Sequence, residues 1–281
     1  MAQRLIIEAG RSERQYWRDL WRYRELFVFL AWRDILIRYK QTTVGVAWSL
    51  LRPFLTMVIL SVVMVICGLD GGGAPVPLFV FSAMLPWQFF STALSESGAS
   101  LVNNSNLISK VYFPRLVVPA SSVITSFVDF LISAGFAALL MLWYWYPIQP
   151  QIVFLPFFVL LTFGASFGAG LWVSALMVKY RDFRFIVPFV VQFGLYATPV
   201  FKMTGRIPEH WIWHGHDIPA RLLYSLNPMV GIVDGFRWSL LGREHAIYWP
   251  GFTISLVGVV LLVWTGLWYF RKTERKFADL I

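Results

Sequence analysis

The chain has 281 residues, of which 58% are hydrophobic, 18% are aromatic and only 14% carry a charged side chain. This composition excludes a disordered chain, a coiled coil and a small disulfide-linked domain, and it is typical of a membrane protein that crosses the bilayer several times. The formal net charge is +9, and its distribution along the chain decides what it means. The single cysteine, Cys67, cannot form an internal disulfide and does not report the redox compartment.

Long uncharged segments predict six transmembrane helices in an all-α, polytopic membrane protein. A helix needs about 20 apolar residues to cross a hydrocarbon core of about 30 Å. The longest uncharged segment, between Asp129 and Lys179, is divided by Pro147 and Pro150, since proline ends helices. We therefore expect spans at about 50–69, 75–95, 116–144, 151–178, 184–201 and 249–270.

The basic residues lie mostly on one side of these spans. Nineteen of the 24 Lys and Arg residues fall in segment 1–52, in the loops after the second and fourth spans, and in the C-terminal tail. Because cytoplasmic loops carry an excess of Lys and Arg, we expect both termini in the cytoplasm. The charge then reflects membrane topology, so we expect contacts with membrane lipids and no nucleic-acid partner.

Segment 16–40 alternates aromatic and basic residues. Trp32, Ile35, Leu36 and Tyr39 fall on one helical face, and basic amphipathic helices with aromatic residues lie in the membrane interface. Two interpretations stay open, a topology anchor or a helix that frames the entrance to a transport path.

A short cytoplasmic helix is predicted over 103–113. Asn103 or Ser105 can cap its start, and Pro114 follows its end. Its apolar face would consist of Leu107, Ile108, Val111 and Tyr112. Such a face requires either the lipid surface or a groove on a soluble partner.

The region 202–248 is the one long extracytoplasmic segment expected. Its first part is rich in turn residues, and its second part is amphipathic with a break at Asn227-Pro228. We expect two short helices there, lying against or dipping into the outer leaflet.

An aromatic face is predicted on the fifth span. Phe185, Phe189, Phe193 and Tyr196 follow at steps of four, four and three, which places them on one side of a helix. They are either ordinary lipid-facing or core aromatics or a rail along a conduit. Flat apolar rings suit the C–H faces of sugars and hold them without directed hydrogen bonds, as a long moving polymer requires.

Two features suggest other chemistry. The segment Gly164 to Gly168 matches G-x-S-x-G around Ser166, but it lies within a span, where small residues also let helices approach closely. Asp129 lies within the third span, where an acidic group costs about 2.5–3.5 kcal/mol and usually faces protein or water. An intramembrane hydrolase and a proton-coupled carrier therefore remain as alternatives.

A polar cluster in the extracytoplasmic region has metal-binding residue types. Its members are Glu209, His210, His214, His216 and Asp217. Nothing in the sequence fixes their spacing, so we expect a solvated loop and no metal site. The chain also contains no G-x-x-x-x-G-K-[ST] motif, so ATP would have to be bound by another polypeptide.

Four stretches in order along the chain resemble the membrane subunit of bacterial ABC-2 type polysaccharide exporters, the group that exports O-antigen and teichoic-acid polymers. The first stretch contains Arg33, Asp34, Arg38, Tyr39 and Lys40, followed by Gly45, Trp48 and Pro53. The second contains Glu96, then Asn106, Leu107, Ile108 and Lys110, and ends with Phe113, Pro114 and Arg115. The third contains Tyr180, Arg181 and Asp182, followed by Pro188, Gln192, Thr198, Pro199 and Val200, and the fourth contains Asn227, Pro228 and Arg237. Residues 1–15 and 209–217 fall outside the pattern.

The resemblance implies one ABC-2 type transmembrane domain over 1–281 that is a transport subunit and no enzyme. Two copies would form a channel, with spans one and five lining it, and two copies of a separate P-loop ATPase would bind ATP and Mg, so this chain itself would hold no cofactor. The substrate would be a lipid-linked polysaccharide crossing the bacterial inner membrane; an ABC-2 permease for a drug or lipid is the alternative.

The resemblance also implies residue roles. The residues implied to couple transport to the ATPase are Asn106, Leu107, Ile108, Lys110, Phe113, Pro114 and Arg115, and those of the interface helix are Arg33, Asp34, Arg38 and Tyr39. The implied channel-lining aromatics are Phe185, Phe189, Phe193 and Tyr196. The periplasmic gate would contain Asn227, Pro228 and Arg237, and the cytoplasmic loop would contain Tyr180, Arg181 and Asp182.

Overall fold

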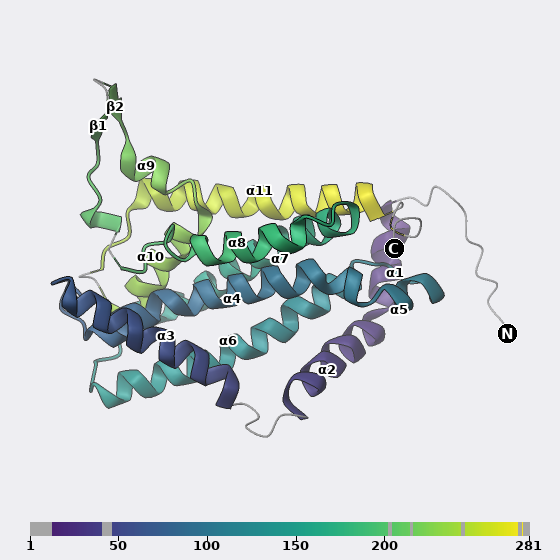
Figure 1. The fold of residues 1–281 in the computed structure, drawn as a ribbon, viewed down its shortest axis with the longest axis horizontal. Helices are drawn as coiled ribbons and strands as arrows, with labels where there is room; N and C mark the ends of the chain where they lie inside the picture. The colour runs from purple at the N-terminus through teal and green to yellow at the C-terminus, as the bar shows by residue number, and fades with distance from the viewer. Residues whose placement is uncertain are drawn as a thin grey trace.

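The computed structural model of the chain describes residues 13–40, 47–201, 204–213, 216–242, 245–274 and 277. Long helices run side by side along one axis, and short elements lie at both ends of the bundle (Figure 1). Among the described residues, five helices are long and apolar enough to cross a membrane. They are α3 (Ala47–Ile66), α4 (Val76–Asn103), α6 (Val117–Trp143), α7 (Leu155–Lys179, preceded by the 3-10 turn Pro150–Phe154) and α11 (Trp249–Glu274). Five of the six predicted spans are confirmed.

The sixth predicted span, over 184–201, is helical only in its first part. Helix α8 covers Phe183–Gly194, which at about 1.5 Å per residue is too short to cross a hydrocarbon core alone. Residues 195–200 continue as turns, although they are as apolar as the helix. Pro199 prevents the helix from resuming before Val200, because it has no N–H to donate and disfavours a helical conformation at Thr198.

At one end of the bundle, here the α5 end, two short helices lie near the last turn of α11, and a longer one leads from there back along α6 (Figure 1). These are α1 (Glu13–Arg22), α2 (Arg24–Lys40) and α5 (Ser105–Lys110). Segment 16–40 is thus two helices that meet at Tyr23, where a single helix was expected. The short helix expected over 103–113 is only six residues long, because α4 continues to Asn103.

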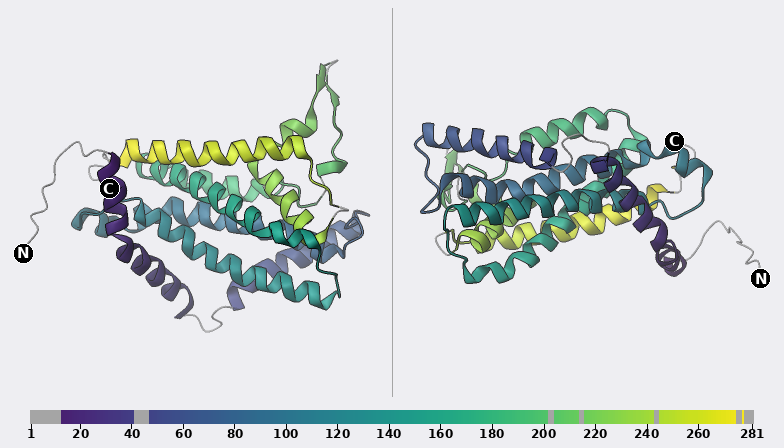
Figure 2. Two further views of the ribbon diagram at one scale, coloured as in Figure 1. Left: turned by 180° about the vertical axis from the view of Figure 1, so that it is seen from behind. Right: turned by 90° about the horizontal axis from the view of Figure 1, so that it is seen from below.

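The opposite end, the hairpin end, carries α9 (Ala220–Tyr224), α10 (Pro228–Leu241) and a two-stranded ribbon, β1 (Trp211–Trp213) with β2 (His216–Ile218). The antiparallel ribbon, which the sequence did not predict, projects beyond the bundle (Figures 1 and 2). The two short helices are confirmed. Asn227 caps α10 by accepting a hydrogen bond from the Met229 amide at 3.0 Å, and Pro228 takes the first helical position, where its missing N–H costs nothing.

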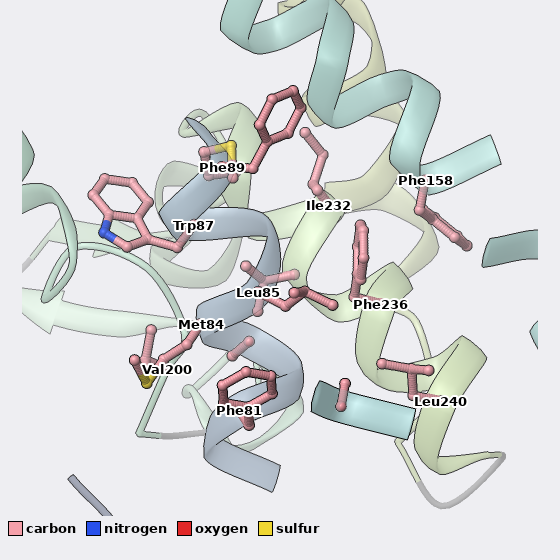
Figure 3. Close-up of a cluster of buried hydrophobic side chains, with 14 of the residues drawn as sticks. Phe81, Met84, Leu85, Trp87, Phe89, Phe158, Val200, Ile232, Phe236 and Leu240 are labelled. Carbon is pink, nitrogen blue, oxygen red and sulfur yellow. The ribbon is translucent and has the colours of Figure 1, made fainter. Parts of the chain in front are cut away.

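Helix α10 is buried inside the hairpin end, whereas the sequence places it against the outer leaflet. It packs on α4, α7 and α11, and Figure 3 shows its side chains Ile232, Phe236 and Leu240 in one cluster with α4 and Phe158 of α7. Two glycines allow this close packing, since a Cβ at Gly231 would lie 2.6 Å from that of Ser255 and one at Gly235 would collide with the Phe158 ring. Amphipathicity did not reveal the burial because the polar residues of α10 find partners inside the protein.

Helices α7 and α11 touch through glycines. A Cβ on Gly168 would lie 2.6 Å from the carbonyl carbon of Leu262, and one on Gly266 would collide with the carbonyl oxygen of Gly168. Ser166 lies in the same stretch, wholly buried in the middle of α7. A nucleophile elbow needs a strand–turn–helix context that α7 does not provide. The G-x-S-x-G match is therefore a helix-packing motif.

Candidate transport path and coupling site

The four aromatic side chains predicted on one face do share an exposed face of α8 and the turn that follows it. Phe185, Phe189, Phe193 and Tyr196 are 81%, 60%, 53% and 63% exposed, and the rings of Phe189 and Phe193 lie 4.3 Å apart. On the opposite side, Val187 is buried in a small cluster with Leu94, Ala169 and Met177 of α4 and α7. We call the four aromatic residues the rail.

Helix α3 lies on the same side of the bundle as α8 (Figure 2, right). It packs on α4 and α6 with one side and leaves most of its apolar side chains exposed. Among the exposed residues are Phe54, Leu55, Val58, Ile59, Val62 and Val63. Helices α3 and α8, the two expected to line a conduit, therefore leave broad apolar faces uncovered in a single chain.

The segment after the rail is fastened to α9 and α10. The Asn227 amide donates to the carbonyl oxygen of Ala197 at 3.0 Å, and the Arg237 guanidinium donates to that of Val200 at 2.6 Å. The Thr204 hydroxyl donates to Asp234 at 2.9 Å. Arg221 donates to the carbonyl oxygens of Gly205 and Ile207. We call the four side chains Arg221, Asn227, Asp234 and Arg237 the clamp.

Two of the three predicted gate residues, Asn227 and Arg237, belong to the clamp, and the third, Pro228, starts α10. Asp234 and Arg221 were missed. Asp234 carries a signal that could have been read, because it stands three residues before Arg237 and so shares its helical face. Arg221 gives no such signal, since its partners are backbone carbonyls.

The clamp contains a buried pair of opposite charges. The Arg237 guanidinium lies 3.8 Å from the ring centroid of Phe79, and both Arg237 and Asp234 are buried. Burial raises the pKa of Asp234 to about 6, against the opposing influence of the Thr204 hydroxyl and the Arg237 charge. Burial likewise lowers the pKa of Arg237 to about 10. Near neutral pH both groups are mostly charged, and each charge lowers the free-energy cost of burying the other.

The residues predicted to couple to an ATPase divide into two groups at the α5 end. Ile108, Phe113 and Pro114 are buried, and Phe113 packs in a cluster with Leu30, Leu116 and Phe270. Arg115 donates its backbone amide to the Glu274 carboxylate at 2.8 Å and its guanidinium to the Glu274 carbonyl oxygen. Of the predicted coupling residues, Asn106 and Lys110 are exposed and Leu107 is half-buried. Their neighbours Ser109, Val111 and Tyr112, which were not predicted to couple, are exposed as well.

The predicted interface-helix residues bind the bundle. Arg33 pairs with Asp34 at 2.7 Å and donates to the Asn104 side chain, between α4 and α5, at 2.9 Å. Arg38 bridges two carboxylates, Glu96 of α4 at 2.7 Å and Asp129 of α6. Tyr39 also donates to Asp129, and burial together with this bond raises the pKa of Tyr39, so its hydroxyl keeps the proton.

Asp129 is therefore part of an ion network that fixes the end of α2. We expect Arg38→Leu to lower thermal stability in detergent by about 5 °C, because it leaves two neighbouring carboxylates without their shared cation. Arg38→Leu/Asp129→Leu should recover most of that loss and keep transport. Loss of transport in the double variant at native stability would instead support a proton-carrying role for Asp129.

The remaining predicted residues lie in loops. Tyr180, Arg181 and Asp182 are exposed between α7 and α8, with the Lys179 ammonium 4.8 Å from the Tyr180 ring centroid. Glu209 and His210 are exposed as well, whereas His214 and the side chains of His216 and Asp217 lie outside the described residues. Within the described part of the chain, no three metal-binding side chains come together.

Together, the five long apolar helices, the shorter apolar helix and the exposed aromatic face define a polytopic α-helical membrane protein. The chain belongs to the ABC-2 type transporter family, which matches residues 25–241. It is similar to the O-antigen export system permease protein RfbA of Myxococcus xanthus, with 28% identity over 264 residues, 94% of this chain and 98% of that protein. Two Klebsiella pneumoniae proteins of the same name are each 24% identical, covering 92% of this chain and 95% of their own length.

Proposed function

We propose that this chain is the channel-forming subunit of an ATP-driven exporter that moves a lipid-linked, O-antigen-like polysaccharide across the bacterial inner membrane. The observation that carries the proposal is the rail, four aromatic side chains aligned and exposed on one side of the bundle. Aromatic faces give a sugar chain apolar contact without fixing it in place. The names of the three relatives, all O-antigen export permeases, support the same substrate class.

A second copy of this chain completes the conduit in this proposal. In the described part of one chain the rail and the exposed side of α3 are uncovered, and a conduit lined by them needs a facing wall, which a second copy supplies. Two copies of a separate P-loop ATPase bind the α5 end, which lies in the cytoplasm with both termini, and the hairpin end faces the periplasm. ATP and Mg are bound by that partner.

Truncating the rail tests the substrate contact. Phe189→Ala/Tyr196→Ala should slow polymer export about tenfold, because two of the four rings that the polymer contacts are lost. Dimer assembly and ATP hydrolysis should stay at parental levels. Export is measured as polymer reaching the cell surface per amount of transporter in the membrane.

The matched control is Ile186→Ala/Val190→Ala, which removes exposed apolar side chains of α8 outside the rail. It should export at the parental rate. Equal export rates in the parent, the rail variant and the control would mean that the rail residues are ordinary lipid-facing aromatics. The main support for a polymer substrate would then be lost.

The division of the coupling residues gives a second test. Lys110→Glu/Tyr112→Ala should uncouple ATP hydrolysis from export at native stability, since both side chains are exposed at the α5 end. Phe113→Ala should instead destabilise the folded chain by about 3 kcal/mol, because Phe113 is only 4% exposed. Melting curves and co-purification of the ATPase separate the two effects. Normal coupling in the double variant would mean that the ATPase docks elsewhere.

A further inference from the structure

The two ends of the rail are held very differently. At the hairpin end, four clamp contacts hold Ala197, Val200, Thr204 and Ile207, which follow the rail in the sequence. Arg221 belongs to α9, Asn227 caps α10, and Asp234 and Arg237 belong to α10, which is itself packed into the bundle core between α4, α7 and α11. The last ring of the rail shares this anchorage, since Tyr196 stacks on Phe201 with centroids 6.2 Å apart and planes 9° from parallel.

The rest of α8 is held by its three-residue link to α7, residues 180–182, and by one small cluster near its α5 end. All of its residues are described, and Val187 is the one side chain among them that is buried. Val187 belongs to a small cluster that is separate from the main core, with Phe183 and Val191 half-buried at its edge. Elements with few buried apolar contacts are the ones that move at low free-energy cost.

A tight contact marks where the fixed and loosely held parts meet. Helix α8 ends at Gly194, and a Cβ there would collide with the outer edge of the Trp87 indole. Trp87 is buried, and it points to the side of α4 away from Phe158 and Ile232 (Figure 3). The absence of a side chain at Gly194 lets the helix end rest directly on this ring.

We propose that the clamp positions the exit end of the rail as a fixed point, and that the rail opens and closes by swinging its α5 end about the contact between Gly194 and Trp87. Phe185 and Phe189 then move with α8, while Tyr196 stays in place. This inference rests on the proposed export function and assigns positioning roles to Arg221, Asn227, Asp234, Arg237 and Trp87. A swing of this kind narrows the conduit at its entrance and leaves its exit unchanged.

Cross-linking of the full transporter complex in membranes tests the fixed point. In a Cys67→Ser parent, Ala197→Cys/Leu226→Cys joins the rail end to the exposed residue beside Asn227 and leaves every clamp side chain in place, and Phe183→Cys/Val102→Cys joins the start of α8 to α4. A short bis-maleimide links each pair, and the four single-cysteine proteins treated in the same way are the controls. Polymer export should stay within about twofold of the parent for the clamp pair and fall about tenfold for the α4 pair.

Loss of export when the clamp pair is linked, together with normal export when the α4 pair is linked, would overturn the inference. If the proposed function were wrong, the result would look different, because the parent without cross-links would export no polymer.

The contact between Gly194 and Trp87 is tested without cross-links. Gly194→Ala should slow export several-fold with the assembly intact, and Trp87→Phe, which removes the outer edge of the indole, should restore it. Failure of Trp87→Phe to rescue Gly194→Ala would also overturn the proposal.

Discussion

Gly168→Leu is expected to destabilise the folded chain strongly, because it forces α7 and α11 apart. A Cβ at this position already meets backbone atoms of α11, at 2.6 Å from the Leu262 carbonyl carbon and 2.7 Å from the Val263 nitrogen. Backbone cannot move aside as a flexible side chain can, so the two helices must separate. We expect a loss of about 3 kcal/mol or more and a fall in melting temperature of about 10 °C.

The matched control for this change is Gly135→Leu. Gly135 lies in α6 and has no atom within 4 Å of where its Cβ would stand. The control should be neutral or slightly stabilising, because leucine favours a helix over glycine by up to about 0.8 kcal/mol. Thermal unfolding in a mild detergent compares the two. Equal melting temperatures would show that α7 and α11 do not pack through Gly168.

Arg237→Leu is expected to cost about 3–5 kcal/mol, because it leaves Asp234 buried without its cation and removes a donor from the Val200 carbonyl oxygen. The loss should depend on pH. In the folded chain the pKa of Asp234 is about 6, above its ordinary 3.8, so the ionisation of this group lowers stability as pH rises through that interval. Removing Arg237 makes the ionised form still costlier.

The deficit of Arg237→Leu should therefore be larger at pH 8 than at pH 5, where Asp234 is mostly protonated. Arg237→Leu/Asp234→Asn should recover part of the stability at pH 8, since the uncompensated charge is gone and an amide oxygen can still accept from Thr204. Melting temperatures of the three proteins at both pH values measure this. A deficit that does not change with pH would show that Asp234 and Arg237 do not form a coupled pair.

Much of the membrane architecture could be predicted, because charged residues or, between α6 and α7, prolines interrupt the apolar sequence between spans. This signal placed four helices within four residues of both observed bounds, whereas α4 continues to Asn103, eight residues past its predicted end at 95. The signal failed at α8, where the apolar run continues to Val200 but the helix ends at Gly194. There, Pro199 and the clamp contacts determine the backbone, and uncharged sequence alone does not reveal them.

The candidate site was predicted where it follows helical periodicity and missed where it depends on distant partners. The spacing from Phe185 to Tyr196 placed four rings on one face correctly. The burial of α10 and the partners of Arg38 depend on contacts between residues far apart in the sequence, such as Arg38 with Asp129. Phe113 reads from sequence as part of an exposed coupling segment, yet it anchors that segment to α2 and α11.

The most direct test of the central claim is the amount of polysaccharide on either side of the inner membrane in cells that lack this chain. We predict that lipid-linked polymer accumulates inside the cell and disappears from the surface, and that export returns with the intact chain but only weakly with Phe189→Ala/Tyr196→Ala. Unchanged surface polysaccharide in cells without the chain would contradict the account.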